Sequence, residues 1–208
     1  MASQRWAYDP KTKRYRDLDT GKYLSRSTVI KLRDEFVQRS REAIAGLAGK
    51  LADKSLTVQA WEKQMRAAVK DATAAQYMFG RGGQNAMAAA DWGRVGRMTR
   101  DGYTYLRAFA QDIADGKLSE AQIAARAALY LSSTTNAYER GRAAAFAISL
   151  PVYPCDGGTQ CKANCKCNWE ITETETEYKA VWKLNSAAEN CDGCKARAAT
   201  YDPFVVKK

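Results

Sequence analysis

The chain has 208 residues, a formal net charge of +10 and no histidine. Hydrophobic residues make up 46% of it, which is enough for a folded core and excludes a wholly disordered chain. No apolar run approaches the roughly 18 residues that a membrane span requires, and residues 1–8 lack the apolar core of a signal peptide. We therefore expect a protein that is made in the cytoplasm and does not enter a membrane.

The positive charge is concentrated at the front of the chain. Residues 1–50 carry 12 Lys and Arg against 6 Asp and Glu, whereas residues 155–208 carry 8 of each. A basic surface favours a polyanionic partner, either nucleic acid or an acidic protein surface. An ordinary solvated surface explains the same charge equally well.

The first elements in chain order are a short β flap and a long helix. Turn residues Asp19-Thr20-Gly21-Lys22 separate two short β-prone segments, so residues 1–25 are expected to form a flap or arm. Ser25 or Ser27 is then expected to cap a helix that runs to about Lys50, in which apolar residues recur at helical spacing.

Three further helices are expected to follow. Thr57 caps one in which apolar residues alternate steps of three and four, and Gly80-Arg81-Gly82-Gly83 ends it. The next covers about 92–114. Ser119 and Gln122 then form a capping box for a helix over about 120–148.

The whole pattern predicts an α+β protein that is predominantly α. Residues 1–25 form the flap, residues 26–150 form a bundle of about four helices, and residues 151–208 form a cysteine-rich module built on a β-hairpin.

Five of the six cysteines form a pattern with metal-ligand spacing. They are Cys161-x3-Cys165-x-Cys167 and Cys191-x2-Cys194. Strands predicted over 168–174 and 178–184 would bring both groups to the base of one hairpin. Within a strand, the second and third cysteines would face the same side. A C-x2-C turn presents two thiolates to one ion, so the spacing predicts a structural zinc site with four thiolate ligands.

The ligand set and the alternatives to zinc stay open at this point. Five candidates compete for four places, with Cys191 and Cys194 expected to bind and two of the other three to complete the site. Cys155 lies outside the pattern and is expected to be free. Disulfides, an iron–sulfur cluster and unligated thiols are the alternatives, and the missing signal peptide argues against disulfides.

Catalysis is not expected from these residues. Four thiolates leave no open coordination position for water or substrate, so such a site would stabilise the fold rather than react. Without histidine, no serine has its usual activating base. Thiolate chemistry at Cys155 or Cys161 is the one enzymatic hypothesis that the sequence supports.

The sequence around the cysteines resembles the C-terminal signature of phage minor head proteins of the Mu-F-like head-morphogenesis group. The resemblance rests on Leu150-Pro151-Val152-Tyr153-Pro154, on Asp156-Gly157-Gly158-Thr159-Gln160-Cys161, and on Asn164-Cys165-Lys166-Cys167-Asn168-Trp169. It covers about residues 57–200. The group commonly has a histidine where Cys161 stands, and its C-x2-C pair usually precedes the Asn-Cys run instead of following it.

The resemblance implies a structural virion protein made in the host cytoplasm. Such a minor head or connector-associated subunit would be oligomeric in the particle, contact the portal or major capsid protein, and assist head assembly or DNA delivery. Packaged DNA is a further partner that the basic front half fits. The alternative function is a zinc-dependent nucleic-acid-binding phage protein, which the net charge and the cysteine pattern support.

Overall fold

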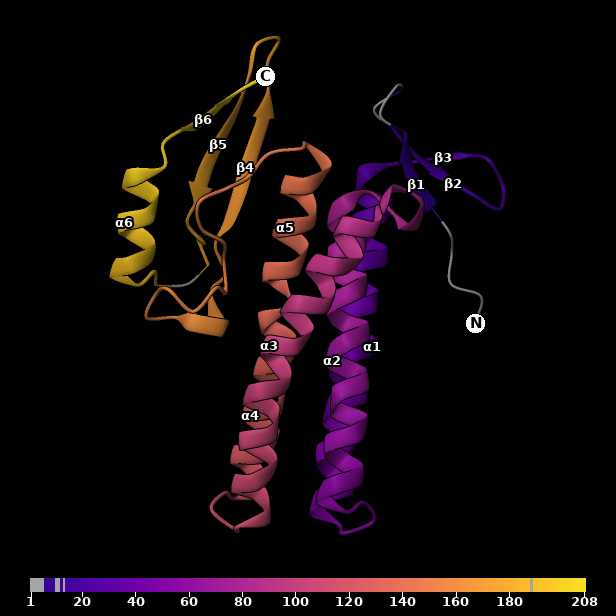
Figure 1. The fold of residues 1–208 in the computed structure, drawn as a ribbon, viewed down its shortest axis with the longest axis vertical. Helices are drawn as coiled ribbons and strands as arrows, with labels where there is room; N and C mark the ends of the chain where they lie inside the picture. The colour runs from indigo at the N-terminus through magenta and orange to yellow at the C-terminus, as the bar shows by residue number, and fades with distance from the viewer. Residues whose placement is uncertain (1–5, 10–11, 13, 188) are drawn as a thin grey trace.

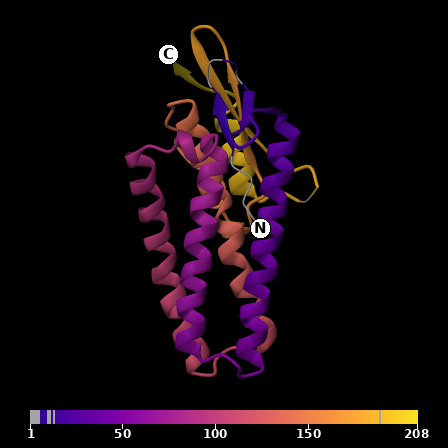
Figure 2. The ribbon, with the colours of Figure 1, turned by 90° about the vertical axis from the view of Figure 1, so that its right-hand side faces the viewer.

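The computed structural model describes residues 6–9, 12, 14–187 and 189–208, and its fold is α+β and mainly helical. The helices are α1 (Arg26–Ala52), α2 (Val58–Arg81), α3 (Ala89–Ala114), α4 (Glu120–Ser133), α5 (Thr135–Ala145) and α6 (Asp192–Thr200), with short 3-10 turns η1 (Gln84–Ala86) and η2 (Lys162–Asn164). Helices α1, α2 and α3 lie beside a rod formed by α4 and α5, and two small sheets lie at one end of these helices (Figures 1 and 2). The predicted class, α+β and predominantly α, is confirmed; residues 1–5, 10, 11 and 13 of the predicted flap lie outside the described residues.

Three helix starts and one helix end are determined by residues within one turn of them, as predicted. The side-chain oxygens of Ser25, Thr57 and Ser119 each accept the backbone N–H three residues further on, at 3.0, 3.2 and 3.3 Å. Gln122 completes the capping box by accepting the N–H of Ser119 at 2.8 Å. Helix α2 ends at Gly82, whose φ of +103° is a conformation that glycine adopts readily.

The predicted helix over 120–148 is divided into α4 and α5 and ends earlier. At the division, the hydroxyl and the N–H of Thr134 both donate to the carbonyl of Leu131, at 2.6 and 3.1 Å. This local bonding replaces the regular helical pattern at one residue. The helix ends at Ala145 because Ala147 has a φ of +55°, which a right-handed helix does not contain.

Helix α3 begins at Ala89 rather than at the predicted Trp92. The carboxylate of Asp91 accepts the N–H of Ala88 at 2.9 Å and so caps the first turn from inside the helix. No helix in the described part of the chain is long and apolar enough to cross a membrane.

Residues 26–145, which we call the helical body, share an apolar core. Trp61 of α2 meets Phe109 of α3 edge to face, with ring centroids 5.2 Å apart. Several side chains of this core are completely shielded from solvent: Trp61, Met65, Leu106, Phe109 and Ala127. The apolar seam predicted on α2 therefore packs within the chain.

The approach of α2 to α5 depends on two glycines. A Cβ on Gly80 would meet the carbonyl oxygen of Tyr138 and would lie 2.8 Å from the amide nitrogen of Arg142. A Cβ on Gly141 would meet the carbonyl oxygen of Tyr77. The two helices therefore touch backbone to backbone, and no side chain fits between them.

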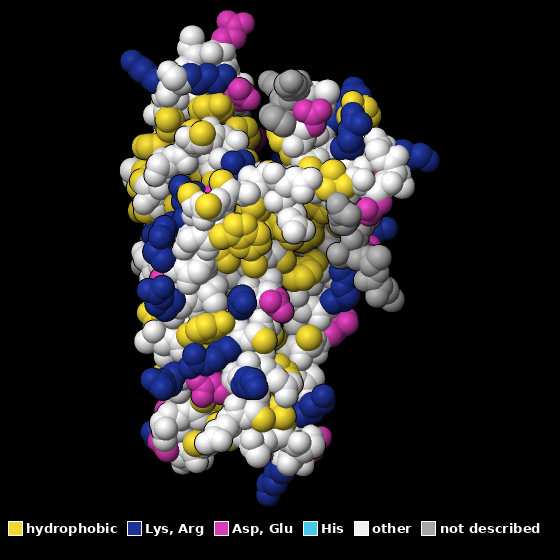
Figure 3. All heavy atoms as spheres, turned by 45° about the vertical axis from the view of Figure 1, so that its right-hand side comes forward, with side chains coloured by type: hydrophobic (Ala, Val, Ile, Leu, Met, Phe, Trp, Pro, Cys, Tyr) yellow, Lys and Arg dark blue, Asp and Glu magenta, His cyan; other side chains and the backbone are white. Residues whose placement is uncertain are grey.

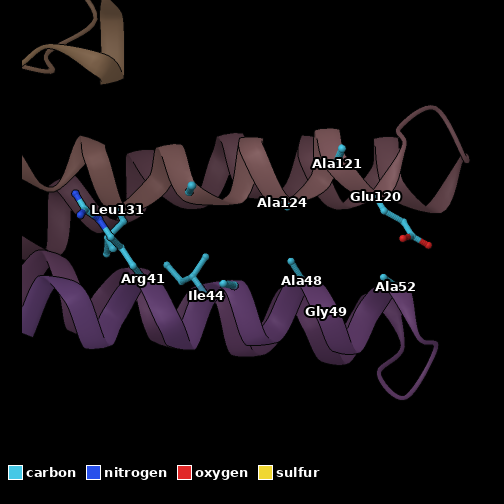
Figure 4. Close-up of a pocket in the computed structure, with 11 residues that line it drawn as sticks. Arg41, Ile44, Ala48, Gly49, Ala52, Glu120, Ala121, Ala124 and Leu131 are labelled. Carbon is cyan, nitrogen blue, oxygen red and sulfur yellow. The ribbon is translucent and has the colours of Figure 1, made fainter. Parts of the chain in front are cut away.

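Helices α1 and α4 leave a groove of about 420 Å³ between them. Figure 4 shows Ala48 and Gly49 on one side and Ala121 and Ala124 on the other. These side chains are too small to fill the space between the two helix backbones.

The flap is an antiparallel sheet in the order β1 (Trp6–Asp9), β2 (Arg14–Asp17), β3 (Tyr23–Leu24). Its buried Trp6 packs on Phe79, with ring centroids 5.2 Å apart. The N–H of Tyr8 donates to the carbonyl of Gly82 at 2.5 Å. The flap therefore docks on the C-terminal end of α2.

The second sheet belongs to the C-terminal module and has the order β4 (Asn168–Glu173), β5 (Glu177–Lys183), β6 (Phe204–Lys207). The predicted hairpin forms as β4 and β5. In its antiparallel register, Asn168 pairs with Lys183 at the base, and Glu173 pairs with Tyr178 at the tip. Strand β6 and helix α6 were not predicted.

A hydrogen bond from an arginine of a buried ion pair on α5 joins the helical body to the module. The Arg142 Nη1 donates to the carbonyl of Trp169 at 2.7 Å and to the two carboxylate oxygens of Glu139 at 3.2 and 3.1 Å. Glu139 is only 2% exposed, and burial raises the pKa of its carboxyl despite the neighbouring guanidinium.

Candidate metal centre

Two short elements place the cysteine groups. The 3-10 turn η2 lies between Cys161 and Cys165, so this pair flanks one tight turn. The C-x2-C pair spans the first turn of α6: Cys191 is its N-cap residue, and its carbonyl accepts the N–H of Cys194 at 3.0 Å. Each pair of thiols is therefore held by a local turn, and the β4–β5 hairpin brings the two turns together.

Three thiols converge closely enough to bind one ion. The Cys194 sulfur lies 3.6 Å from that of Cys161 and 3.7 Å from that of Cys165, and all three sulfurs lie within 4.8 Å of one another. Thiolates about 2.3 Å from a tetrahedral zinc ion are about 3.8 Å apart, so the observed distances fit its ligand edges. They are far longer than the roughly 2.05 Å of a disulfide bond, and all six cysteines are free thiols in this structure.

Cys191 was expected to be a ligand, but among the described residues the group of sulfurs within 4.8 Å of one another does not include it. Burial raises the pKa of Cys191, but hydrogen bonds with the backbone and the thiols of Cys194 and Cys161 outweigh that effect and lower the pKa to about 7. Burial and the three neighbouring thiols raise the pKa of Cys194. Crowded thiols resist ionising together unless a cation balances their charge, and a bound metal ion supplies that charge.

The other two cysteines have different partners. Cys167 is buried, and its thiol lies 3.7 Å from the Oδ1 of Asn190. The Cys155 thiol is 3.3 Å from the carbonyl oxygens of Ala163 and Cys165, and burial raises its pKa to about 12. Cys155 therefore remains a neutral thiol that donates to the backbone.

The expected strand geometry of Cys165 and Cys167 is wrong. Strand β4 begins only at Asn168, and Cys165 ends the turn η2 with a φ of −58° and a ψ of 129°. The two residues therefore precede the strand, and the turn rather than a strand face directs Cys165 to the other thiols.

Polar contacts that the sequence did not predict tie the cysteine loop to α6. Asp156 accepts two hydrogen bonds from Arg197, both at 3.1 Å, and the Gln160 Oε1 accepts the N–H of Gly193 at 2.9 Å. These contacts hold the two cysteine groups at a fixed spacing. The sequence gives only a weak signal for these contacts, because Asp156 and Gln160 lie among turn residues and their partners on α6 are distant in sequence.

Apolar packing closes the centre on the side of the sheet. Cys165, Cys167 and Cys194 belong to one buried cluster with Trp169 and Trp182, whose rings lie edge to face 5.3 Å apart. Three thiols converge at the edge of this apolar cluster. The arrangement can hold a metal ion and stabilise the module.

Comparison with protein-family models, with curated proteins and with solved structures finds no match for the chain.

Proposed function

We propose that the C-terminal module binds one structural zinc ion through Cys161, Cys165, Cys191 and Cys194. The convergence of three of these thiols within 4.8 Å of one another carries the proposal. Cys191, the N-cap residue of the helix turn that holds Cys194, is the first candidate for the fourth position. Sulfur ligands select zinc over the hard cations that prefer oxygen. Cys167 is the remaining candidate for the fourth position.

The zinc ion would supply most of the stability of the module. Residues 151–208 form one hairpin with a third strand and a nine-residue helix, which is little material for an independent core. In small domains of this kind, the free energy of metal binding is also folding free energy.

For the whole chain, we propose a structural virion protein: a minor head or portal-associated subunit that assists phage head assembly or DNA delivery. Support comes from the resemblance of residues 150–169 to the C-terminal signature of phage minor head proteins. This segment contains the cysteine loop and the start of β4. Four helical rods, namely α1, α2, α3 and α4 continued by α5, would form a rigid body for contacts with the portal or major capsid protein. The protein would be oligomeric in the particle and would act without catalysis.

Mass spectrometry of purified, DNA-filled particles from the phage that encodes this chain tests the proposal. The chain should be present at a low copy number that matches the symmetry of the portal or head vertex. A capsid-free lysate fraction serves as the control for carry-over. Absence of the chain from purified particles would contradict the virion role and would leave the zinc proposal untouched.

A further inference from the structure

A groove of about 680 Å³ lies between the flap, the C-terminal ends of α2 and α5, and the tip of the β4–β5 hairpin. Figure 3 shows a hollow between two lobes at this end of the molecule. The hairpin side of the groove is formed at the Glu173–Tyr178 end, whereas the cysteines lie at the Asn168–Lys183 end. The groove is therefore separate from the candidate metal centre.

Aromatic rings from several elements line this groove. They are Tyr8, Tyr15 and Tyr23 of the flap, Phe79 of α2, Tyr138 of α5, Phe146 after α5, and Tyr178 of β5. Tyr23 is 47% exposed, and the guanidinium groups of Arg14 and Arg16 lie 5.2 and 4.9 Å from its ring centroid. Exposed rings flanked by guanidinium groups form surfaces on which other planar groups can stack.

The groove also carries excess positive charge. Four arginines line it, two of which are neutralised by buried carboxylates: Arg81 by Asp91 and Arg142 by Glu139. Arg14 and Arg26 are exposed, and no ion pair joins either to a carboxylate within the described part of the chain, although Asp9 lies opposite Arg14 in the β1–β2 register.

The acidic side chain in the described lining does not cancel this charge. Glu173 pairs with Lys208, whose Nζ lies 2.9 Å from its Oε1. The lining therefore presents two exposed guanidinium groups beside a set of aromatic rings.

We propose that this groove binds a short segment of single-stranded nucleic acid. Arg14 and Arg26 would contact phosphates, and Tyr23 and its neighbouring rings would stack on unpaired bases. Aromatic stacking selects single strands because the bases of a duplex are already stacked on one another. An acidic peptide would use the same charge but would have no planar bases to engage the rings.

Fluorescence anisotropy with a labelled oligothymidylate of about ten nucleotides tests the proposal on the full chain. We expect saturable binding at about 50 mM salt that weakens as salt rises, and weaker binding of a duplex of equal length. Absence of binding at low salt would overturn the proposal, as would equal or tighter binding of the duplex.

Matched variants distinguish binding at this groove from non-specific binding to positive charge elsewhere on the surface. Arg14→Gln with Arg26→Gln should reduce the slope of log K against log salt by about 1.4, because each lost phosphate contact contributes about 0.7. The control pair Arg100→Gln with Arg107→Gln removes the same charge from exposed positions on α3 outside the groove. Equal losses from both pairs would overturn the assignment of the site.

A second variant pair tests the stacking role of Tyr23. Tyr23→Ala should weaken binding at least about fivefold, whereas Tyr23→Phe, which keeps the ring, should bind like the unmodified chain. An unchanged affinity of the alanine variant would contradict the proposal. Far-ultraviolet circular dichroism confirms that each variant is folded, and zinc content is measured separately because it does not depend on this groove.

Discussion

The helical body and the C-terminal module differ in the side chains that form their cores. The body buries large apolar side chains from several long helices, with Trp61, Leu106 and Phe109 completely shielded from solvent. The module has two buried tryptophans, and thiols make up much of the rest of its core. In the body, each side chain supplies a modest share of the total, about 1.5–3 kcal/mol for a large apolar group.

The difference predicts two patterns of sensitivity. Loss of one contact in the body should reduce stability by a measurable amount and leave the fold intact. Loss of one ligand of the proposed zinc site should remove the structure of the module, because metal binding and folding would there be a single process. Four substitutions test whether the two regions differ in this way.

Cys194→Ser should have the largest effect and should confine it to the module. It replaces the thiol that lies closest to both Cys161 and Cys165, so zinc affinity and the fixed packing of Trp169 and Trp182 should be lost together. Near-ultraviolet circular dichroism reports on the tryptophans, and far-ultraviolet circular dichroism reports on the helical body, which should remain.

The matched control is Cys155→Ser, because a serine hydroxyl can donate to the same two carbonyl oxygens as the Cys155 thiol. This variant should keep both zinc and the tryptophan signal. An equal loss in both variants would show that any cysteine substitution harms the module, and would argue against a defined ligand set.

Arg142→Ala should cost about 3–5 kcal/mol in free energy of unfolding, because it leaves the buried Glu139 without its cation. It also removes the hydrogen bond to the carbonyl of Trp169, so the contact between the two regions should weaken. Urea unfolding measures the change. The control Arg126→Ala breaks a more exposed pair with Asp112 and should cost less than about 1 kcal/mol.

Gly141→Ala should cost about 2–3 kcal/mol, because the added methyl group would push the backbones of α2 and α5 apart. The control is Gly46→Ala in α1, where nothing lies within 4 Å of the added Cβ. That change should stabilise the protein by about 0.5–1 kcal/mol through helix propensity. If both alanine variants were more stable than the unmodified chain, the backbone contact between α2 and α5 at Gly141 would be contradicted.

Asp91→Asn should have the smallest of these effects, about 1–3 kcal/mol near neutral pH. Burial raises the pKa of Asp91, but hydrogen bonds from the N–H of Ala88, from Tyr77 and from Arg81 outweigh it and hold the pKa below its usual value. The carboxylate therefore stabilises the fold above the pKa of the unfolded chain, near 3.8, and this contribution is lost as pH falls through the lower folded value.

Urea titrations of both chains at neutral and acidic pH measure that contribution. The gap in stability between the unmodified chain and Asp91→Asn should narrow as pH falls below about 3.8. A gap that is independent of pH would show that Asp91 contributes through packing rather than through its charge.

The elements that could be predicted from the sequence are those fixed by short-range chemistry. Ser25, Thr57 and Ser119 act as caps through contacts within one turn, and Gly82 ends its helix through its own backbone conformation. The hairpin was predicted because alternating residues mark its two strands. Each of these signals lies within a few residues of the feature that it determines.

The features that were missed depend on contacts distant in sequence. Strand β6 pairs with β5 only after the chain returns from α6. The division at Thr134 is an exception, because it depends on one local hydrogen bond among many helix-favouring alanines. At the candidate site, the spacing predicted five cysteines but could not choose among Cys161, Cys165 and Cys167. That choice depends on the turn η2, which directs the first two toward Cys194.

The proposal that a zinc ion stabilises the C-terminal module is tested by measuring the metal content of the full chain, purified under reducing conditions without added metal. Elemental analysis with native mass spectrometry should find one zinc ion per chain, and a strong chelator should remove the zinc and the tryptophan signal of the module together. A module that keeps its structure without any metal ion would contradict the account.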